Sequence, residues 1–257
     1  LWEQSWDDGA IVLDAANDVH TDPSKVHEID HHGRWFDVQG PHMVEPSPQR
    51  TPVIFQAGSS ARGMQFASRH GEAVFVAAPQ GPAGAELVTQ LRETAAEAGR
   101  DPASMKIIHA TRLIVAETDE QAHAMKAEWD RNFSVEGFLA LFGGWTGIDL
   151  GGHSADTPIA SIPATAMRTW VERWQREDPD HEWTVGDLAR RLAEGGAGTA
   201  FVGSATTVAD QLEEFADTTG LDGFNLITSP VPWGLEQVVD HLVPELQRRG
   251  RLRTAYT

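Results

Sequence analysis

The residues of this sequence best placed to bind a ligand are Gly58, Ser59, Ser60 and Gly63, which follow the apolar run 53–55. A continuous apolar run is typical of a buried parallel strand, glycine permits a sharp turn, and serine commonly caps a helix. The first N–H groups of a helix over 60–70 would then face outward at the carboxyl end of that strand and bind an anion, most often phosphate. A strand–cap–helix junction without any ligand fits the same residues.

Three residues near this junction have two interpretations each. We expect Gln56 to point toward the face of the phosphate cradle, where it either contacts the ligand or bonds an adjacent strand. Arg62 is more often a solvated helix charge than a phosphate ligand. Trp233 follows the last expected strand, and it either forms a wall of the pocket or packs inside the protein.

A histidine-rich stretch, with His27, Asp30, His31 and His32, raises the question of a metal site. Adjacent histidines point in different directions in most backbone conformations, and the sequence has no cysteine to add a ligand. We therefore expect no metal to bind there.

Three other groups of residues favour structural roles. Trp170 and Trp174 have helical spacing and, with Trp183, are expected to pack in the core. The segment 201–204 precedes a helix cap like a second phosphate loop, but a plain strand-to-helix connection is favoured. The C-terminal arginines are expected to complement the last helix dipole or neighbouring acids; they are Arg248, Arg249, Arg251 and Arg253.

The composition narrows the class of protein. The chain has 257 residues, a formal net charge of -18 and no cysteine, and its pI is about 4.9. The acidic surface disfavours nucleic acid and anionic membranes as partners. The absence of cysteine favours a cytoplasmic location, and no apolar run approaches the length of a membrane span. Nothing at the start of the sequence resembles a secretory signal.

Alternating apolar runs and helix patterns predict an α/β fold with a parallel sheet and a ligand site at the carboxyl ends of its strands. Strands are expected at 52–57, 73–78, 107–116 and 223–228, with shorter ones at 35–38 and 200–202. Helices are expected at 60–70, 83–98, 119–141, 163–176, 184–194, 206–219 (capped by Thr206 or Thr207) and 234–249, and 1–13 as the tail of one more. Four convincing core strands cannot close an eight-stranded barrel. The pattern leaves two possibilities, a small open sheet with helical insertions or part of a barrel.

Several segments, taken together and in order, resemble one family along almost the whole chain. They are 27–33, 36–41, 46–49, 52–60, 146–150, 183–185, 201–204, 222–226 and 242–250. These segments are similar to the large component of two-component flavin-dependent monooxygenases of the nitrilotriacetate monooxygenase type. Dibenzothiophene-sulfone monooxygenase and pristinamycin synthase belong to the same group, within the bacterial-luciferase-like superfamily.

The resemblance implies a TIM-barrel fold of the luciferase-like type, of which this chain carries only the C-terminal half, about four β/α units. On this interpretation, residues 1–257 form a single partial barrel domain, and 117–199 form a helical insertion within it. The strands at 52–57, 73–78, 107–116 and 223–228 would be barrel strands five to eight, and the start of the family's chain would be missing.

The resemblance also implies a function. The family inserts one oxygen atom from O2 into a small organic substrate by means of a flavin hydroperoxide. The reduced FMN comes from a separate NAD(P)H:FMN reductase, the functional partner. Homodimers or higher oligomers are expected by analogy. Which organic compound is the substrate stays open.

Carried over residue by residue, Ser59 and Ser60 resemble the family's phosphate-binding serines. Gly58 supplies the turn, Gly63 permits close approach of the backbone, and Gln56 is a further candidate for flavin contact. The catalytic residues are unknown, because the family's groups near the reactive flavin edge lie mainly in the absent half. Two alternatives remain: a non-catalytic fragment or split-barrel chain that needs a partner chain, and a deazaflavin-dependent relative.

Overall fold

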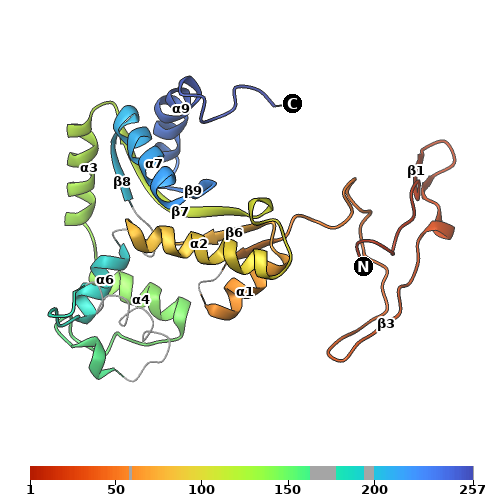
Figure 1. Cartoon of the computed structure of the whole chain (residues 1–257), viewed down its shortest axis with the longest axis horizontal. Coiled ribbons are helices and arrows are strands. Elements are labelled where there is room, and N and C mark those ends of the chain that lie inside the picture. The colour runs from red at the N-terminus through yellow and green to blue at the C-terminus, as the bar shows by residue number, and fades with distance from the viewer. Residues whose placement is uncertain (58–59, 163–177, 194–199, 257) are drawn as a thin grey trace. The chain divides into compact units, whose positions relative to one another are not determined.

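The computed structural model describes residues 1–57, 60–162, 178–193 and 200–256. The chain divides into two compact units, 1–54 and 55–257 (Figure 1). Across the described ranges, no helix has the length and apolar character needed to cross a membrane.

The first unit consists of two small antiparallel hairpins. One pairs β1 (Ile11–Asp14) with β2 (Val19–Thr21), and the other pairs β3 (His31–His32) with β4 (Asp37–Val38). The expected helix over 1–13 is therefore wrong. The Asp14 carboxylate accepts hydrogen bonds from the backbone N–H groups at 16 and 17 and so favours a turn over a helix. The expected strand at 35–38 is reduced to its last two residues.

The second unit contains a five-stranded, wholly parallel sheet. The long strand β7 pairs with β6 and β8 along different parts of its length, and with β9 (Figure 1). The strands are β5 (Phe55–Ala57), β6 (Ala73–Val76), β7 (Lys106–Ala116), β8 (Ala200–Ser204) and β9 (Gly223–Thr228). The four expected core strands are thus confirmed, with β5 and β6 shorter than predicted. They lie side by side in the order β5–β6–β7–β9, and β8 adds a fifth strand.

The longer helices alternate with these strands as predicted. They are α1 (Ala61–His70), α2 (Pro82–Glu97), α3 (Asp119–Arg131), α4 (Val135–Thr146), α6 (Val185–Ala193) and α7 (Ala205–Thr219). The single helix expected over 119–141 is wrong, because Ser134 caps a new helix by accepting a hydrogen bond from the N–H of Gly137 (3.0 Å). The expected helix 163–176 lies outside the described residues.

The last expected helix, 234–249, has three parts. These are α8 (Trp233–Gln237), a π-helical turn (Val238–Leu242) and α9 (Val243–Arg248). Pro244 lies at the start of α9 and has no N–H to donate, which explains the break in the α-helical ladder.

Two hydrophobic cores hold the second unit together. The main core packs α1, α2, α7 and the π-helical turn against one face of the sheet, around Val74, Leu91, Ile107 and Phe215. A smaller core joins α4, α6 and the loop between them around Leu139, Leu150 and Leu188. Trp183 packs against this second core, in agreement with its expected structural role; Trp170 and Trp174 lie outside the described residues.

Candidate functional site

The strand register divides the sheet into a covered face and an open face. Residues paired across parallel strands point to the same side, so Gln56, which pairs with Val74, lies on the face covered by the main core. Its amide Nε2 donates to the carbonyl of Ala57 (3.2 Å). Phe55 lies on the opposite face and stacks on Phe75 with ring centroids 5.5 Å apart. Gln56 is therefore on the side of the sheet that carries α1.

Helix α1 begins three residues beyond β5, at the carboxyl edge of the sheet. Ser60 is its N-cap, and the Ser60 hydroxyl oxygen accepts a hydrogen bond from the N–H of Gly63 (3.1 Å). The hydroxyl keeps its own O–H for donation, and the first helical N–H groups, at Ala61 and Arg62, have no acceptor within the helix. Ser60 and Gly63 thus come together at one helix end, while Gly58 and Ser59 lie outside the described residues.

The start of α1 differs from other helix starts because it lacks a negative charge. The first turns of α3, α4 and α6 each contain an acidic residue, whereas the first turn of α1 contains none and carries Arg62. A cation is unfavourable at the positive end of the helix dipole unless an anion lies nearby. In a chain of net charge -18, a helix start without an acid is therefore suited to an external anion.

The other phosphate-loop candidate, at 201–204, already has an internal anion. The Asp119 carboxylate accepts hydrogen bonds from the N–H of Ser204 (2.6 Å) and the hydroxyl of Thr207 (3.0 Å), at the start of α7. Gly203 permits this approach, since a Cβ there would lie 2.9 Å from the carboxylate. The bonds from Ser204 and Thr207 lower the pKa of Asp119 below its usual value. The favoured interpretation, a strand-to-helix connection, agrees with this geometry.

The cap of α7 differs from the prediction. The sequence offered Thr206 or Thr207, but the N-cap is Ser204, whose hydroxyl oxygen accepts from the N–H of Thr207 (3.4 Å). Strand β8 runs two residues further than expected, so the helix also begins earlier and the cap moves to the end of the strand.

His109 is a buried ionisable residue that the sequence analysis did not single out. It is fully buried in β7, and its Nδ1 accepts a hydrogen bond from the N–H of Ala78 (3.1 Å). Its ring lies 4.8 Å from that of Phe215. Burial lowers the pKa of His109 to about 4, and the carbonyl of Val76 opposes this shift only in part. His109 is therefore neutral at pH 7 and fixes the loop after β6 rather than carrying charge.

The remaining candidates have structural surroundings. Trp233 lines a shallow hollow of about 520 Å³ beside Gln121, Met125 and Gln237, together with Ala116 and Glu117 at the end of β7. His32 lies between Asp30 (3.2 Å) and Asp37 (3.1 Å). Within the described ranges no group of three or more potential ligands could hold a metal ion.

The C-terminal arginines pair with neighbouring acids, as predicted. Arg249 contacts Glu245, Asp210 and Glu213 at 2.6–3.0 Å and so joins α9 to α7. Hydrogen bonds from Arg248 and Arg249 lower the pKa of Glu245 to about 2.

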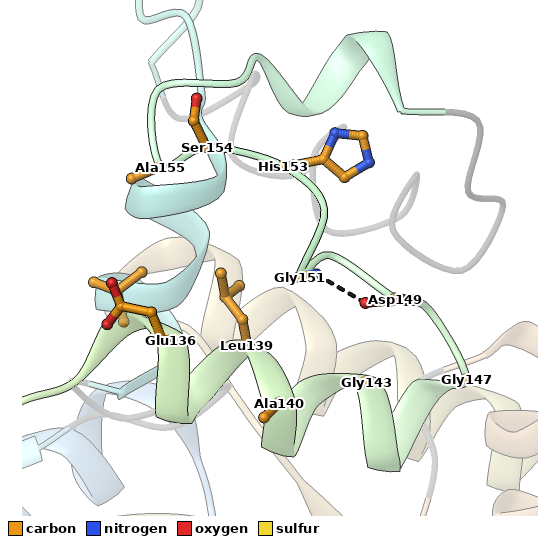
Figure 2. A pocket seen from close by; sticks show the side chains of 11 residues that line it. Glu136, Leu139, Ala140, Gly143, Gly147, Asp149, Gly151, His153, Ser154 and Ala155 are labelled. Atoms are coloured by element: carbon orange, nitrogen blue, oxygen red, sulfur yellow. Dashed lines mark hydrogen bonds between the residues drawn. The ribbon is translucent and has the colours of Figure 1, made fainter.

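A larger cavity, of about 550 Å³, lies between α4 and the loop 147–155 (Figure 2). Leu139 and Glu136 project into it from the helix, and Asp149 and His153 belong to the facing loop. The sequence analysis missed it, although Gly147 and Asp149 lie in one of the segments that carry the family resemblance. A helix that ends in glycine, followed by a loop rich in Gly and Asp, was the signal available.

Comparison with known proteins agrees with the resemblance drawn from the sequence. The luciferase-like monooxygenase family model matches residues 13–222. The chain is 41% identical over 256 residues to dimethyl-sulfide monooxygenase of Hyphomicrobium sulfonivorans, with 100% of this chain and 53% of that protein covered. It is 38% identical over 258 residues to long-chain alkane monooxygenase of Geobacillus thermodenitrificans, again covering all of this chain and 54% of the relative.

Solved structures give the same result. A crystal structure from Hyphomicrobium sulfonivorans superposes with a TM-score of 0.80 at 41% identity and covers 100% of this chain and 54% of the other. A structure of riboflavin lyase, solved with modified FMN and riboflavin, superposes with a TM-score of 0.81 at 35% identity, covering 100% and 56%. This chain spans about half the length of the relatives it matches. Dibenzothiophene-sulfone monooxygenase, the nitrilotriacetate monooxygenase oxygenase component and pristinamycin IIA synthase are also relatives, so the family inferred from the sequence is confirmed.

Proposed function

The chain belongs to the luciferase-like monooxygenase family, and from this premise we propose that it forms part of the oxygenase component of a two-component, FMNH2-dependent monooxygenase. Its substrates would be O2 and a small organic compound. Reduced FMN, supplied by a separate NAD(P)H:FMN reductase, would provide the oxygen-activating chemistry. The proposal includes a homodimer or higher oligomer.

The start of α1 is the observation that carries this proposal. Of the described helices of eight or more residues, α1 is the one that follows a sheet strand, has a serine cap and lacks both an acid in its first turn and an internal carboxylate at its start. α2 also lacks an acid, but it starts at Gly81-Pro82 without a side-chain cap, and proline has no N–H. The donors at α1 fit a phosphate group, which prefers several N–H and O–H donors at a helix start.

The residues of this chain would divide the work of holding the cofactor. Ser59 and Ser60 would donate to the phosphate, Gly58 would provide the turn between β5 and α1, and Gly63 would keep the backbone of the first turn accessible. Gln56 would support the cradle from the covered face of β5 or contact the flavin. Arg62, in the same turn, would add a charge that favours the anion.

We include in this proposal that the chain carries the C-terminal half of a TIM barrel, with 117–199 as a helical insertion in a single partial domain. Two observations support it: the strand order β5–β6–β7–β9 is that of consecutive barrel strands, and the relatives are about twice as long. The open sheet face supports it too, since the side chains of Phe55 and Ile227 there are 53% and 41% exposed. In a closed barrel such residues face the filled interior.

The same open face favours a second candidate, a split-barrel chain that needs a partner chain. An apolar sheet face and two unpaired strand edges, at β5 and β9, favour association. Sedimentation at several concentrations tests this candidate. A compact monomer at all concentrations would argue against it.

The activity is tested by supplying reduced FMN to the full-length protein with a separate reductase and O2. The substrate panel should include sulfides, sulfones and alkanes. We expect substrate loss that requires both O2 and reduced FMN, with one oxygen atom from ¹⁸O2 in the product. Peroxide formation without any oxygenated product across the panel would argue against the proposal.

A further inference from the structure

The cavity between α4 and the loop 147–155 is a candidate binding site that is independent of the flavin region. All its lining residues come from 135–155, and none comes from the strands of the sheet. Its volume of about 550 Å³ lies within the range of small-molecule pockets, about 300–1,000 Å³. A ligand here can therefore be studied without FMN.

The walls of the cavity are supported from behind by the second core. Leu139 lines the cavity and is 6% exposed, and Leu150, in the facing loop, is fully buried. The loop is held to α6 because the N–H of Gly186 donates to the carbonyl of Ala155 (2.7 Å). The cavity is thus formed by packed elements and exists before a ligand arrives.

Glycines keep the cavity open. Gly147 ends α4 in the left-handed region (φ 71°), which an L side chain rarely adopts. At Gly143 a Cβ would lie 3.3 Å from the carbonyl oxygen of Ile148, and at Gly151 it would lie 3.1 Å from Oδ1 of Asp149. Because these positions require glycine, no side chain from them fills the space.

The lining combines apolar and negatively charged groups. Val135, Leu139 and Ala140 provide apolar surface, and Glu136 and Asp149 provide carboxylates (Figure 2). No lysine or arginine is among the lining residues found in the described part of the chain. On α6, Arg190 pairs with Asp187 (3.2 Å).

These features select among the classes of ligand. Anions would meet two carboxylates and the field of a chain with net charge -18. A bare metal ion would need three or more side-chain ligands, and the described residues offer no such group. A cation with an apolar substituent satisfies both parts of the lining, since its charge pairs with the carboxylates while its alkyl part packs on Leu139.

We propose that this cavity binds a small organic ammonium ion. Glu136 is its main charge partner, because this carboxylate projects into the cavity beside Leu139. Asp149 contributes the second charge, although its Oδ1 also accepts a hydrogen bond from the N–H of Gly151 (2.8 Å).

The test is calorimetric titration of the chain, without flavin, with three compounds of equal length: butylammonium, butyrate and butanol. We expect saturable binding of butylammonium that is at least tenfold tighter than binding of butyrate. Amide NMR shifts should be confined to residues around 135–155. Absence of saturable butylammonium binding, or equal affinity for butyrate, would overturn the proposal.

Three variants locate the charge partner. Glu136→Gln and Asp149→Asn keep the shape of the side chain and remove its charge, and Asp149→Asn keeps an acceptor for Gly151. We expect Glu136→Gln to weaken butylammonium binding about tenfold and Asp149→Asn to weaken it less. Glu128→Gln, an exposed position on α3 outside the cavity, should leave binding unchanged. An equal loss in Glu128→Gln would show attraction to the acidic surface in general and would contradict a site in the cavity.

Discussion

His109 makes the stability of this protein depend on pH in a way that can be calculated. Its pKa falls from 6.5 in the unfolded chain to about 4 in the folded chain, because the imidazole is buried beside Phe215. Its Nδ1 accepts from the N–H of Ala78, so a proton on Nδ1 would also break that hydrogen bond. The folded state therefore favours neutral histidine.

The sign and size of the effect follow from linkage. Above pH 6.5 the histidine is neutral in both states and stability does not change with its titration. Between pH 6.5 and about 4 the unfolded chain binds a proton that the folded chain does not, so stability falls as the pH falls. At about 1.4 kcal/mol per pKa unit, the total loss is about 3 kcal/mol.

The assay compares urea unfolding of the wild type with that of His109→Asn from pH 7.5 to pH 4. Asparagine retains an acceptor for Ala78 but does not titrate, and the other ten histidines are common to both proteins. We expect the variant to be less stable at pH 7.5, and the difference to shrink by about 3 kcal/mol toward pH 4. A difference that stays constant over this range would refute the reasoning, because His109 would then titrate alike in both states.

Three further predictions concern contacts elsewhere in the fold. Arg92 donates to the carbonyls of Pro102 and Gly220 and to Asp222; Arg92→Met should lower the unfolding free energy by about 2 kcal/mol, measured in urea, and an unchanged midpoint would contradict a structural role. Asp119→Ala should lower the melting temperature more than Asp119→Asn, since asparagine keeps an acceptor for Ser204; equal melting temperatures would contradict the shared-carboxylate account. Ser60→Ala should cost about 1 kcal/mol of stability as a lost helix cap and Ser60→Thr much less, by thermal unfolding; equal losses in both variants would argue against capping by the hydroxyl.

The core of the fold was predictable because its signals are local. Apolar runs such as 73–76 and 223–228 identify buried strands, and capping patterns such as Thr118 before Asp119-Glu120 identify helix starts. The N-terminal hairpins were not predicted, since Trp2 and Trp6 have helical spacing while side-chain hydrogen bonds from Asp14 decide for a turn. The sequence could not show how far β8 extends, because pairing with the distant residues 112–116 of β7 sets that length.

The site was predictable in part for the same reason. The strand–serine–helix junction at Ser60 is a local motif, so its geometry could be anticipated from the order of residues. The role of Asp119 at the start of α7 could not, because Asp119 and Ser204 are 85 residues apart in the sequence. Likewise, the burial of His109 depends on Phe215 from a distant helix.

The central claim, that the start of α1 binds the phosphate of FMN, is tested most directly by comparing FMN with riboflavin, which lacks only the phosphate. Fluorescence titration of the chain should show tighter binding of FMN, and Ser60→Ala should reduce that preference about tenfold. Ser134→Ala, which removes the cap of α4 instead, should leave it unchanged. Equal affinity for FMN and riboflavin in the wild type would contradict the account.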